Sequence, residues 1–237
     1  MDERLGKRFR TLLEQLSDGA GESIPMACQD WANTKAAYRF FDNERVNEKD
    51  IIAGHFQSAR QRFLDSDELA LVLHDTTEFR FHRNGIREIG KLTKHVGTKT
   101  RPSLNHIVCG ILMHSSLVVT PDGLPLGLSA VKFWTRDELK GTNALKKHIN
   151  PTRVPIEEKE SIRWQQNLSE STNLLSAPGR CIHIDDRESD IYELFCTAMD
   201  LGTHFVFRTC VALQGTVNTP SKMKCRRQTA KDCTGSK

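Results

Sequence analysis

The stretch from Cys181 to Phe195 constrains the fold more than any other part of the sequence. It begins as a short apolar run typical of a buried strand and then reaches two acids, Asp185 and Asp186. Asp190 precedes Glu193 by three residues, a capping-box spacing that predicts a following helix. Carboxylates at the carboxyl end of a strand mark where α/β sheets bind ligands and metals, although such acids also cap helices in solvent.

A second apolar strand, Leu69 to Leu73, leads through His74 into another acid, Asp75. An aspartate beside a fully apolar strand is costly to bury unless it is paired or binds a cation. Hard divalent ions such as Mg²⁺ are held by one or two carboxylates together with water and phosphate oxygens. Two such strands therefore predict a site for metal-dependent phosphoryl transfer if Asp75 and Asp186 lie close together.

The composition is that of an ordinary globular protein, with 237 residues, 38% hydrophobic and 27% charged. No apolar run reaches the length of a membrane span, and the charged N-terminus does not resemble a secretory signal. The seven cysteines include no Cys-x-x-Cys pair, which favours reduced thiols over disulfides or zinc. These features indicate a cytoplasmic location.

Residues 1–64 are expected to form a small helical domain. Apolar spacing and breaker residues predict an amphipathic first helix ending near Gly19, a short helix after Ser23, a third opening at Thr34 and a fourth opening at Asn47. The first helix carries basic residues on one face, among them Arg4, Lys7 and Arg8. The segment has ten Lys/Arg and ten Asp/Glu, so composition leaves open whether it binds DNA or is only a solvated helical unit.

The rest of the chain predicts a mixed sheet flanked by helices, an α/β (α+β) fold. Strands are expected at 69–81, 105–113, 117–120 and 126–134, followed by a helix at 155–175, the strand and helix described first, and a strand at 204–209. This order resembles that of the ribonuclease H fold, in which the first strand lies beside the strand that carries Asp186. The basic segment 82–101 is either a phosphate-binding loop or a solvated linker.

Several short motifs, taken together, resemble the insertion-sequence-four family of cut-and-paste transposases. They occur in the order of that family and extend to about residue 210. The motifs are Ala37-Tyr-Arg-Phe40, Asp75-Thr-Thr77, Glu158-Lys-Glu-Ser161 followed by Trp164, Asp186-Arg-Glu-Ser-Asp-Ile191 and Phe205-Val-Phe-Arg208.

This resemblance implies a helical domain at 1–64 that binds transposon-end DNA and a ribonuclease H-like catalytic core at 65–210. It assigns Asp75 and Asp186 as catalytic ligands of Mg²⁺ or Mn²⁺, and Asp185 as structural. It also implies that Tyr38 and Arg39 recognise the DNA end, that Arg208 contacts DNA near the catalytic site, and that the family works as a homodimer on double-stranded DNA.

The sequence departs from the family at its third catalytic residue, a glutamate in the pattern Tyr-x2-Arg-x3-Glu-x6-Lys, which is absent here. Residues 211–237 read instead as a basic, disordered tail with few apolar residues. We therefore expect a truncated copy with an incomplete core and little or no cleavage activity. Two alternatives stay open, namely a non-catalytic DNA-binding regulator and a nuclease completed by Glu78 or Glu188.

Overall fold

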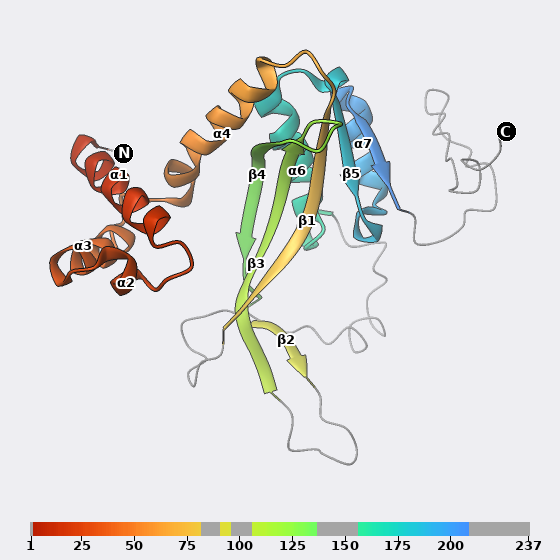
Figure 1. Cartoon of the computed structure of the whole chain (residues 1–237). Helices are drawn as coiled ribbons and strands as arrows, with labels where there is room; N and C mark the ends of the chain where they lie inside the picture. The colour runs from red at the N-terminus through yellow and green to blue at the C-terminus, as the bar shows by residue number, and fades with distance from the viewer. Residues whose placement is uncertain (1, 82–90, 96–105, 137–155, 209–237) are drawn as a thin grey trace, which may run out of the picture.

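The computed structural model describes residues 2–81, 91–95, 106–136 and 156–208 (Figure 1). Within these ranges, a group of N-terminal helices precedes a mixed six-stranded sheet flanked by helices. This architecture confirms the predicted α/β (α+β) class and is consistent with a ribonuclease H-like fold. Most of the basic segment 82–101, the charged segment 137–153 and the tail 211–237 lie outside the described residues, so their predictions stay untested.

The four N-terminal helices begin where short polar side chains cap them. Their bounds are α1 Glu3–Asp18, α2 Ile24–Cys28, α3 Trp31–Phe41 and α4 Glu48–Leu64. The carboxylates of Asp2 and Asp30 and the amide of Asn47 each accept a hydrogen bond from a backbone N–H in the first turn of α1, α3 and α4. Because Asp30 is the cap, α3 starts before Thr34, the residue at which the sequence predicted its start.

Helix α4 connects the N-terminal helices to the sheet. Near its start, Ile51 packs against the buried cluster of α1 to α3, whereas Phe63 near its end belongs to the buried cluster of the sheet. The guanidinium of Arg62 donates to the carbonyl of Leu126 at 2.6 Å, and that of Arg60 donates to the carbonyl of Leu174 at 3.0 Å. The boundary at residue 64 stays a prediction, because α4 takes part in both cores.

The sheet has the order β2-β3-β1-β5-β6, with β4 paired to β3. The strands are β1 Ala70–Phe81, β2 Lys91–His95, β3 His106–Val119, β4 Pro125–Trp134, β5 Cys181–Asp185 and β6 His204–Phe207. β1 and β5 are parallel, as are β5 and β6, whereas β3 pairs antiparallel with β1, β2 and β4. The predicted adjacency of the first strand and the strand beginning at Cys181 is confirmed (Figure 1).

Several predicted elements differ from the structure. The separate strands expected at 105–113 and 117–120 are one strand, β3, and β2 was not expected. The expected helix at 155–175 is a short 3-10 turn, η3 Ile156–Glu158, followed by α6 Ile162–Leu175. Helix α7, Tyr192–Leu201, has Ile191 at its N-cap with no side-chain cap bond, so the capping box expected at Asp190 is not formed.

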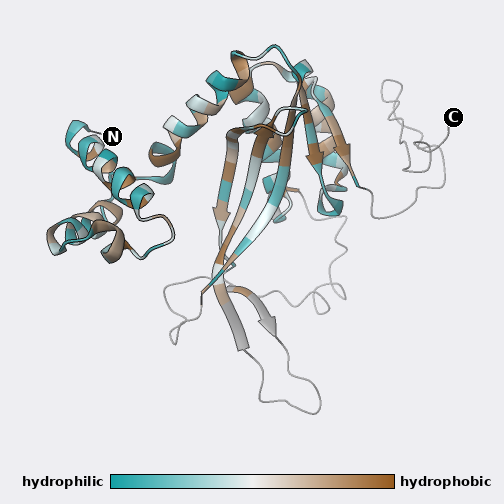
Figure 2. Ribbon diagram, in the orientation of Figure 1, coloured by the Kyte–Doolittle hydropathy of each residue, from teal (hydrophilic) through white to brown (hydrophobic). Residues whose placement is uncertain are grey.

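Helices α4, α6 and α7 cover one face of the sheet. On that face Val72, Val118 and Leu175 are fully buried. Burial alternates along β1, β3 and β5, as it does when one face of a sheet meets the core. Apolar colour follows the upper parts of β1, β5 and β6 in Figure 2.

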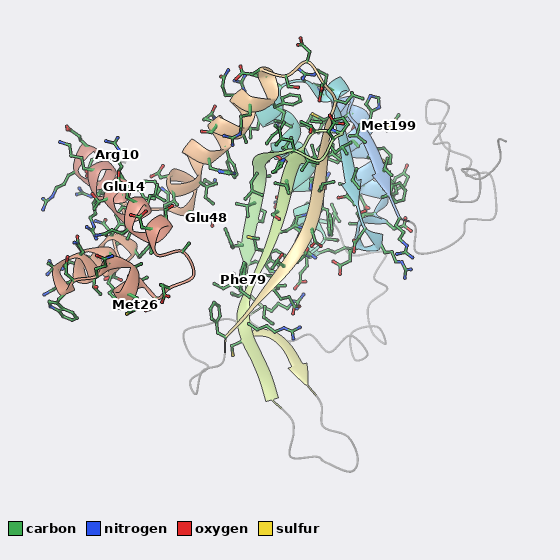
Figure 3. The ribbon with its side chains drawn as sticks, viewed as in Figure 1. Arg10, Glu14, Met26, Glu48, Phe79 and Met199 are labelled. Carbon is green, nitrogen blue, oxygen red and sulfur yellow. The ribbon has the colours of Figure 1, made fainter. Side chains whose placement is uncertain are left out.

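The opposite face is more exposed within the described part of the chain. By the same alternation it carries Leu73, Ile184 and Val206, of which Val206 is 58% exposed. Phe79, labelled in Figure 3 near the lower end of β1, belongs to this face and is 43% exposed. We refer to this surface as the open face, and to the one under α4, α6 and α7 as the covered face.

Candidate functional site

Asp75 and Asp186 occupy neighbouring positions on β1 and just after β5. The parallel register pairs Leu73 with Ile184, and continuing it by two residues sets Asp75 level with Asp186. Both aspartates are exposed, and alternation places both on the open face. Extended in this way, the register sets the two acids that the sequence selected side by side, although Asp75 lies within β1 rather than at its end.

A tight turn holds Asp186 in place. Its carboxylate caps the 3-10 turn η5, Arg187–Ser189, by accepting a hydrogen bond from the N–H of Glu188 at 2.8 Å. The buried hydroxyl of Ser189 donates to the carbonyl of Asp186 at 2.8 Å. The Asp-Arg-Glu-Ser motif thus fixes one carboxylate oxygen against the turn, which limits the positions that the side chain can adopt.

Arg208 follows β6 and continues the row of residues that Asp75 and Asp186 form across the sheet. The register of β5 and β6 pairs Asp185 with Phe207, so the next pair sets Arg208 beside Asp186. Arg208 is exposed, and alternation places it on the open face with the two aspartates. A cation beside two carboxylates is suited to contact a phosphate whose other oxygens approach a metal ion.

Asp185 points the other way, into the covered face. Its Oδ1 atom is buried and has no hydrogen-bond partner among the described residues. Burial, with a smaller contribution from the charge of Asp186, raises the pKa of Asp185 to about 7. This environment fits a structural residue rather than a third ligand beside Asp75.

Glu78 and Glu188, the two acids considered as completing a nuclease, are directed elsewhere. Glu78 lies on the opposite side of β1 from Asp75 by strand alternation, and its carboxylate pairs with Arg80 at 2.8 Å. The carboxylate of Glu188 approaches Arg163 at the start of α6, at 3.4 Å. No group of three or more His, Cys, Asp or Glu suited to a metal occurs within the described ranges.

Two adjacent carboxylates nevertheless fit a hydrated hard cation. Mg²⁺ keeps several of its waters and is commonly bound through one or two carboxylates plus substrate phosphates. Both aspartates are exposed, so water and a phosphate oxygen have room to complete the coordination. The donor set present therefore suits Mg²⁺ or Mn²⁺ and lacks the Cys or His ligands that zinc favours.

A second candidate surface runs along α3. Trp31, Lys35, Tyr38 and Arg39 are all exposed there, and Trp31 is 78% exposed. With Thr34 and Asp42 they line a shallow hollow of about 490 Å³. Exposed aromatic rings among cations on one helix are suited to contacts with DNA bases and phosphates.

The basic residues of α1 are used in different ways. Arg4 and Lys7 are exposed, and Lys7 forms an ion pair with Glu3 at 2.9 Å. Arg8 is half-buried, and its guanidinium donates to the side-chain and backbone oxygens of Asn33 on α3 at 3.0 and 2.8 Å. Arg8 therefore joins α1 to α3, whatever it contributes to DNA binding.

Arg8→Ala is expected to destabilise the N-terminal helices by about 1.5 kcal/mol, because hydrogen bonds from a charged donor would be lost. Arg8→Lys should retain only part of that stability, since an ammonium does not reproduce the two-pronged contact with Asn33. Chemical denaturation followed by circular dichroism measures both effects. Equal stability of the Ala variant and the wild type would contradict the role given to Arg8.

The fold and its surfaces define a class of protein in which a helical unit is joined to a mixed α/β sheet with two adjacent aspartates on one face. Residues 1–46 match a family described as transposase DNA-binding. No curated protein matches the chain. The family match includes α1 to α3, and it supports a transposase-type, DNA-binding role with DNA as the partner. In the part of the chain that is described, no helix is long and apolar enough to cross a membrane.

Trp31 and Lys35 were not predicted from the sequence as part of a DNA-contacting surface. The sequence did contain a pattern that indicates it, because Trp31, Lys35 and Tyr38 recur at helical spacing on one side of α3. It was obscured because the expected helix began at Thr34, which left Trp31 outside it.

Proposed function

We propose that this chain is a transposase of the Asp-Asp-Glu type, similar to the insertion-sequence-four family, that binds transposon ends and carries two of the three carboxylates with which that family acts on phosphodiester bonds. The observation that carries the proposal is the register of β1, β5 and β6, whose extension sets Asp75 on β1 in one row with Asp186 just after β5 and Arg208 just after β6. It occurs in the same chain as a segment matching a transposase DNA-binding family.

In this proposal Asp75 and Asp186 hold Mg²⁺ or Mn²⁺ on the open face. The bound ion would activate a water or DNA 3′-hydroxyl and offset charge that develops on the phosphate. Arg208 orients the DNA backbone beside the aspartates, and the Asp186–Ser189 turn keeps one carboxylate in position before substrate arrives. The same proposal includes assembly as a homodimer on paired DNA ends and a cut-and-paste route of transposition.

The DNA-binding part of the proposal assigns different tasks to α1 and α3. Arg4 and Lys7 contact phosphates, whereas Tyr38 and Arg39 on α3 read the sequence of the DNA end. Their side chains project from two helices that pack together through Phe9 and Phe40, whose rings stack 5.7 Å apart. The packing gives the two helices a fixed relative orientation, which a sequence-specific reader needs.

Arg39→Ala is expected to weaken binding to a preferred duplex about tenfold or more and to reduce discrimination, as loss of a base contact does. Arg4→Ala should instead weaken binding to all duplexes similarly and reduce the salt dependence. The measurement is selection of a preferred duplex from a randomised pool with the full chain, followed by fluorescence anisotropy with selected and scrambled duplexes. Selection of no preferred sequence would contradict end recognition.

A second candidate function is that of a DNA-binding regulator without cleavage activity. It is favoured by one observation, the pairing of Glu78 and Glu188 with arginines, which leaves two carboxylates in the row within the described ranges. Incubation of the selected duplex with the chain and Mn²⁺ tests for cleavage. Specific strand cleavage would exclude the regulator and would also contradict the low activity expected without a third carboxylate, whereas binding without cleavage fits the regulator and an inactive transposase copy alike.

A further inference from the structure

Two histidines are buried between the strands that carry Asp75 and Asp186. His74 on β1 is 6% exposed and His183 on β5 is fully buried. The Nε2 atom of His74 lies 2.8 Å from the Nδ1 atom of His183, and the two rings stack with centroids 5.1 Å apart. Both rings are on the covered face, beneath the row that holds the aspartates.

The positions of the protons in this pair follow from its neighbours. The hydroxyl of Thr172 donates to the carbonyl of Leu168 at 2.8 Å, so its oxygen accepts from Nε2–H of His183 at 3.1 Å. The His183 ring is fully buried, and burial disfavours a charged imidazole, so its Nδ1 atom carries no proton and accepts from Nε2–H of His74. Nδ1 of His74 accepts in turn from the hydroxyl of Ser116 at 2.8 Å.

The result is one directed series of hydrogen bonds. It begins at the amide of Asn167, which donates to the Ser116 oxygen at 3.1 Å, and it ends at the carbonyl of Leu168. It crosses from α6 to β3, β1 and β5 and returns to α6. In this direction of donation both histidines are neutral and protonated at Nε2.

The series specifies one alignment of β1 and β5. A shift of one residue would turn His183 to the open face, and a shift of two would move Nδ1 of His183 out of reach of His74. Either shift would leave buried polar atoms unpaired, which is costly in a core. Asp75 directly follows His74 and Asp186 lies three residues after His183, so the alignment of the histidines also sets that of the aspartates.

We propose that His74 and His183 are positioning residues that hold Asp75 and Asp186 level with each other for metal binding. This inference rests on the proposed metal site. The two aspartates are thereby aligned before a cation arrives, and the binding free energy is not spent on aligning the strands.

Nitrogen-15 NMR of the histidine side chains in the full chain tests the proton arrangement without any metal. At pH 7.5 both His74 and His183 should be neutral Nε2–H tautomers, with a scalar coupling across the hydrogen bond between the rings. An Nδ1–H tautomer, a charged ring or no coupling between the assigned nitrogens would overturn the arrangement.

A second experiment measures the Mn²⁺ affinity of the chain by electron paramagnetic resonance. His74→Leu and His183→Leu should each weaken Mn²⁺ binding about ten- to a hundredfold, the range seen when groups that orient metal ligands are removed. The double Leu variant should regain part of the stability, because no ring nitrogen is left unpaired and only the Ser116 hydroxyl and the Thr172 oxygen lose a partner, yet it should still bind Mn²⁺ weakly. Full recovery of Mn²⁺ affinity in the double variant would overturn the positioning role.

Ser129→Ala provides a matched control. The Ser129 hydroxyl is buried under the same helix, bonds to the Ser171 hydroxyl at 2.9 Å and reaches the Ser116 backbone carbonyl at 3.2 Å, but it touches neither histidine and lies on β4, away from β5. We expect lower stability and unchanged Mn²⁺ affinity. If the wild type binds no Mn²⁺, the proposed metal site fails; if it binds and the histidine variants match it, only the positioning role fails.

Discussion

Replacing Asp75 or Asp186 by asparagine is expected to weaken Mn²⁺ binding by at least about a hundredfold, equivalent to about 2.7 kcal/mol. Asparagine has the shape of aspartate without its charge, and a hard cation depends on charged oxygen ligands. Asp186→Asn also retains an oxygen that accepts from the N–H of Glu188, so the η5 turn should persist. The loss would therefore report on the metal site rather than on local unfolding.

The control for these variants is Asp122→Asn. Asp122 is an exposed aspartate in the turn between β3 and β4. The substitution removes the same charge as the other two variants, but at a position away from Asp75 and Asp186. Mn²⁺ affinity measured by isothermal titration calorimetry should be unchanged in this control. Wild-type affinity in both Asp75→Asn and Asp186→Asn would show that the two aspartates do not bind the ion.

The second large effect is loss of stability in mild acid. Burial is the main cause of depressed pKa values at three histidines: His183 has a pKa of about 4, His114 of about 3, and His74 lies well below its ordinary value of 6.5. Charge repulsion adds to burial at two of them: His183 and His114, once protonated, oppose a charge on His74, and Arg163 opposes a charge on His114.

The direction in which stability changes with pH follows from the protons that the unfolded and folded states bind. Below pH 6.5 the unfolded chain binds protons at these histidines and the folded chain does not, so stability is lost as pH falls. Asp185 acts in the opposite direction, because its raised pKa makes the folded state hold an extra proton between about pH 4 and pH 7. The net difference approaches two protons, which corresponds to about 2.7 kcal/mol per pH unit once the histidines titrate in the unfolded state.

Between pH 6 and pH 4.5 the sheet domain should thus lose on the order of 4 kcal/mol, a large part of a typical folding stability. Urea denaturation at a series of pH values measures this loss. His114→Gln should reduce the dependence on pH, because one of the three buried imidazoles is removed. A urea midpoint that is constant or rises as pH falls from 6 to 4.5 would contradict the neutral buried histidines.

The elements best predicted from sequence are those with local signals. Asn47 caps α4 as expected, and the helix predicted after Asp190 forms as α7, which ends at Gly202 with a φ of 68°, in the left-handed conformation that glycine adopts readily. The adjacency of β1 and β5 was also predicted, because the order of strands and helices resembles that of the ribonuclease H fold. These features need only the residues of one element or one recurrent strand order.

The boundaries of elements were predicted wrongly where polar residues form hydrogen bonds with partners far away in the sequence. The sequence predicted two strands separated at 114–116, but Ser116 is buried within the single strand β3 and bonds to His74 and Asn167. In the same way, Asp190 suggested a helix cap, whereas the cap bond in this segment is made by Asp186 at the start of η5. Sequence periodicity does not show which strand or helix supplies such partners.

The candidate site was predicted only in part. Asp75 and Asp186 could be selected because each follows an apolar run, but the row with Arg208 depends on the register of three strands. The histidine series likewise needs β1, β3, β5 and α6 to be aligned. Both arrangements result from tertiary packing, which a pattern within one segment does not encode.

The most direct test of the central claim uses Fe²⁺ in place of Mg²⁺. Fe²⁺ with ascorbate and peroxide cleaves a polypeptide next to the bound ion, and mass spectrometry of the full chain then locates the cuts. Our account predicts cuts beside Asp75 and Asp186, competed by Mg²⁺ and absent in the Asp75→Asn, Asp186→Asn double variant. Cuts confined to other segments, or cuts that persist in that variant, would contradict a metal site formed by these two aspartates.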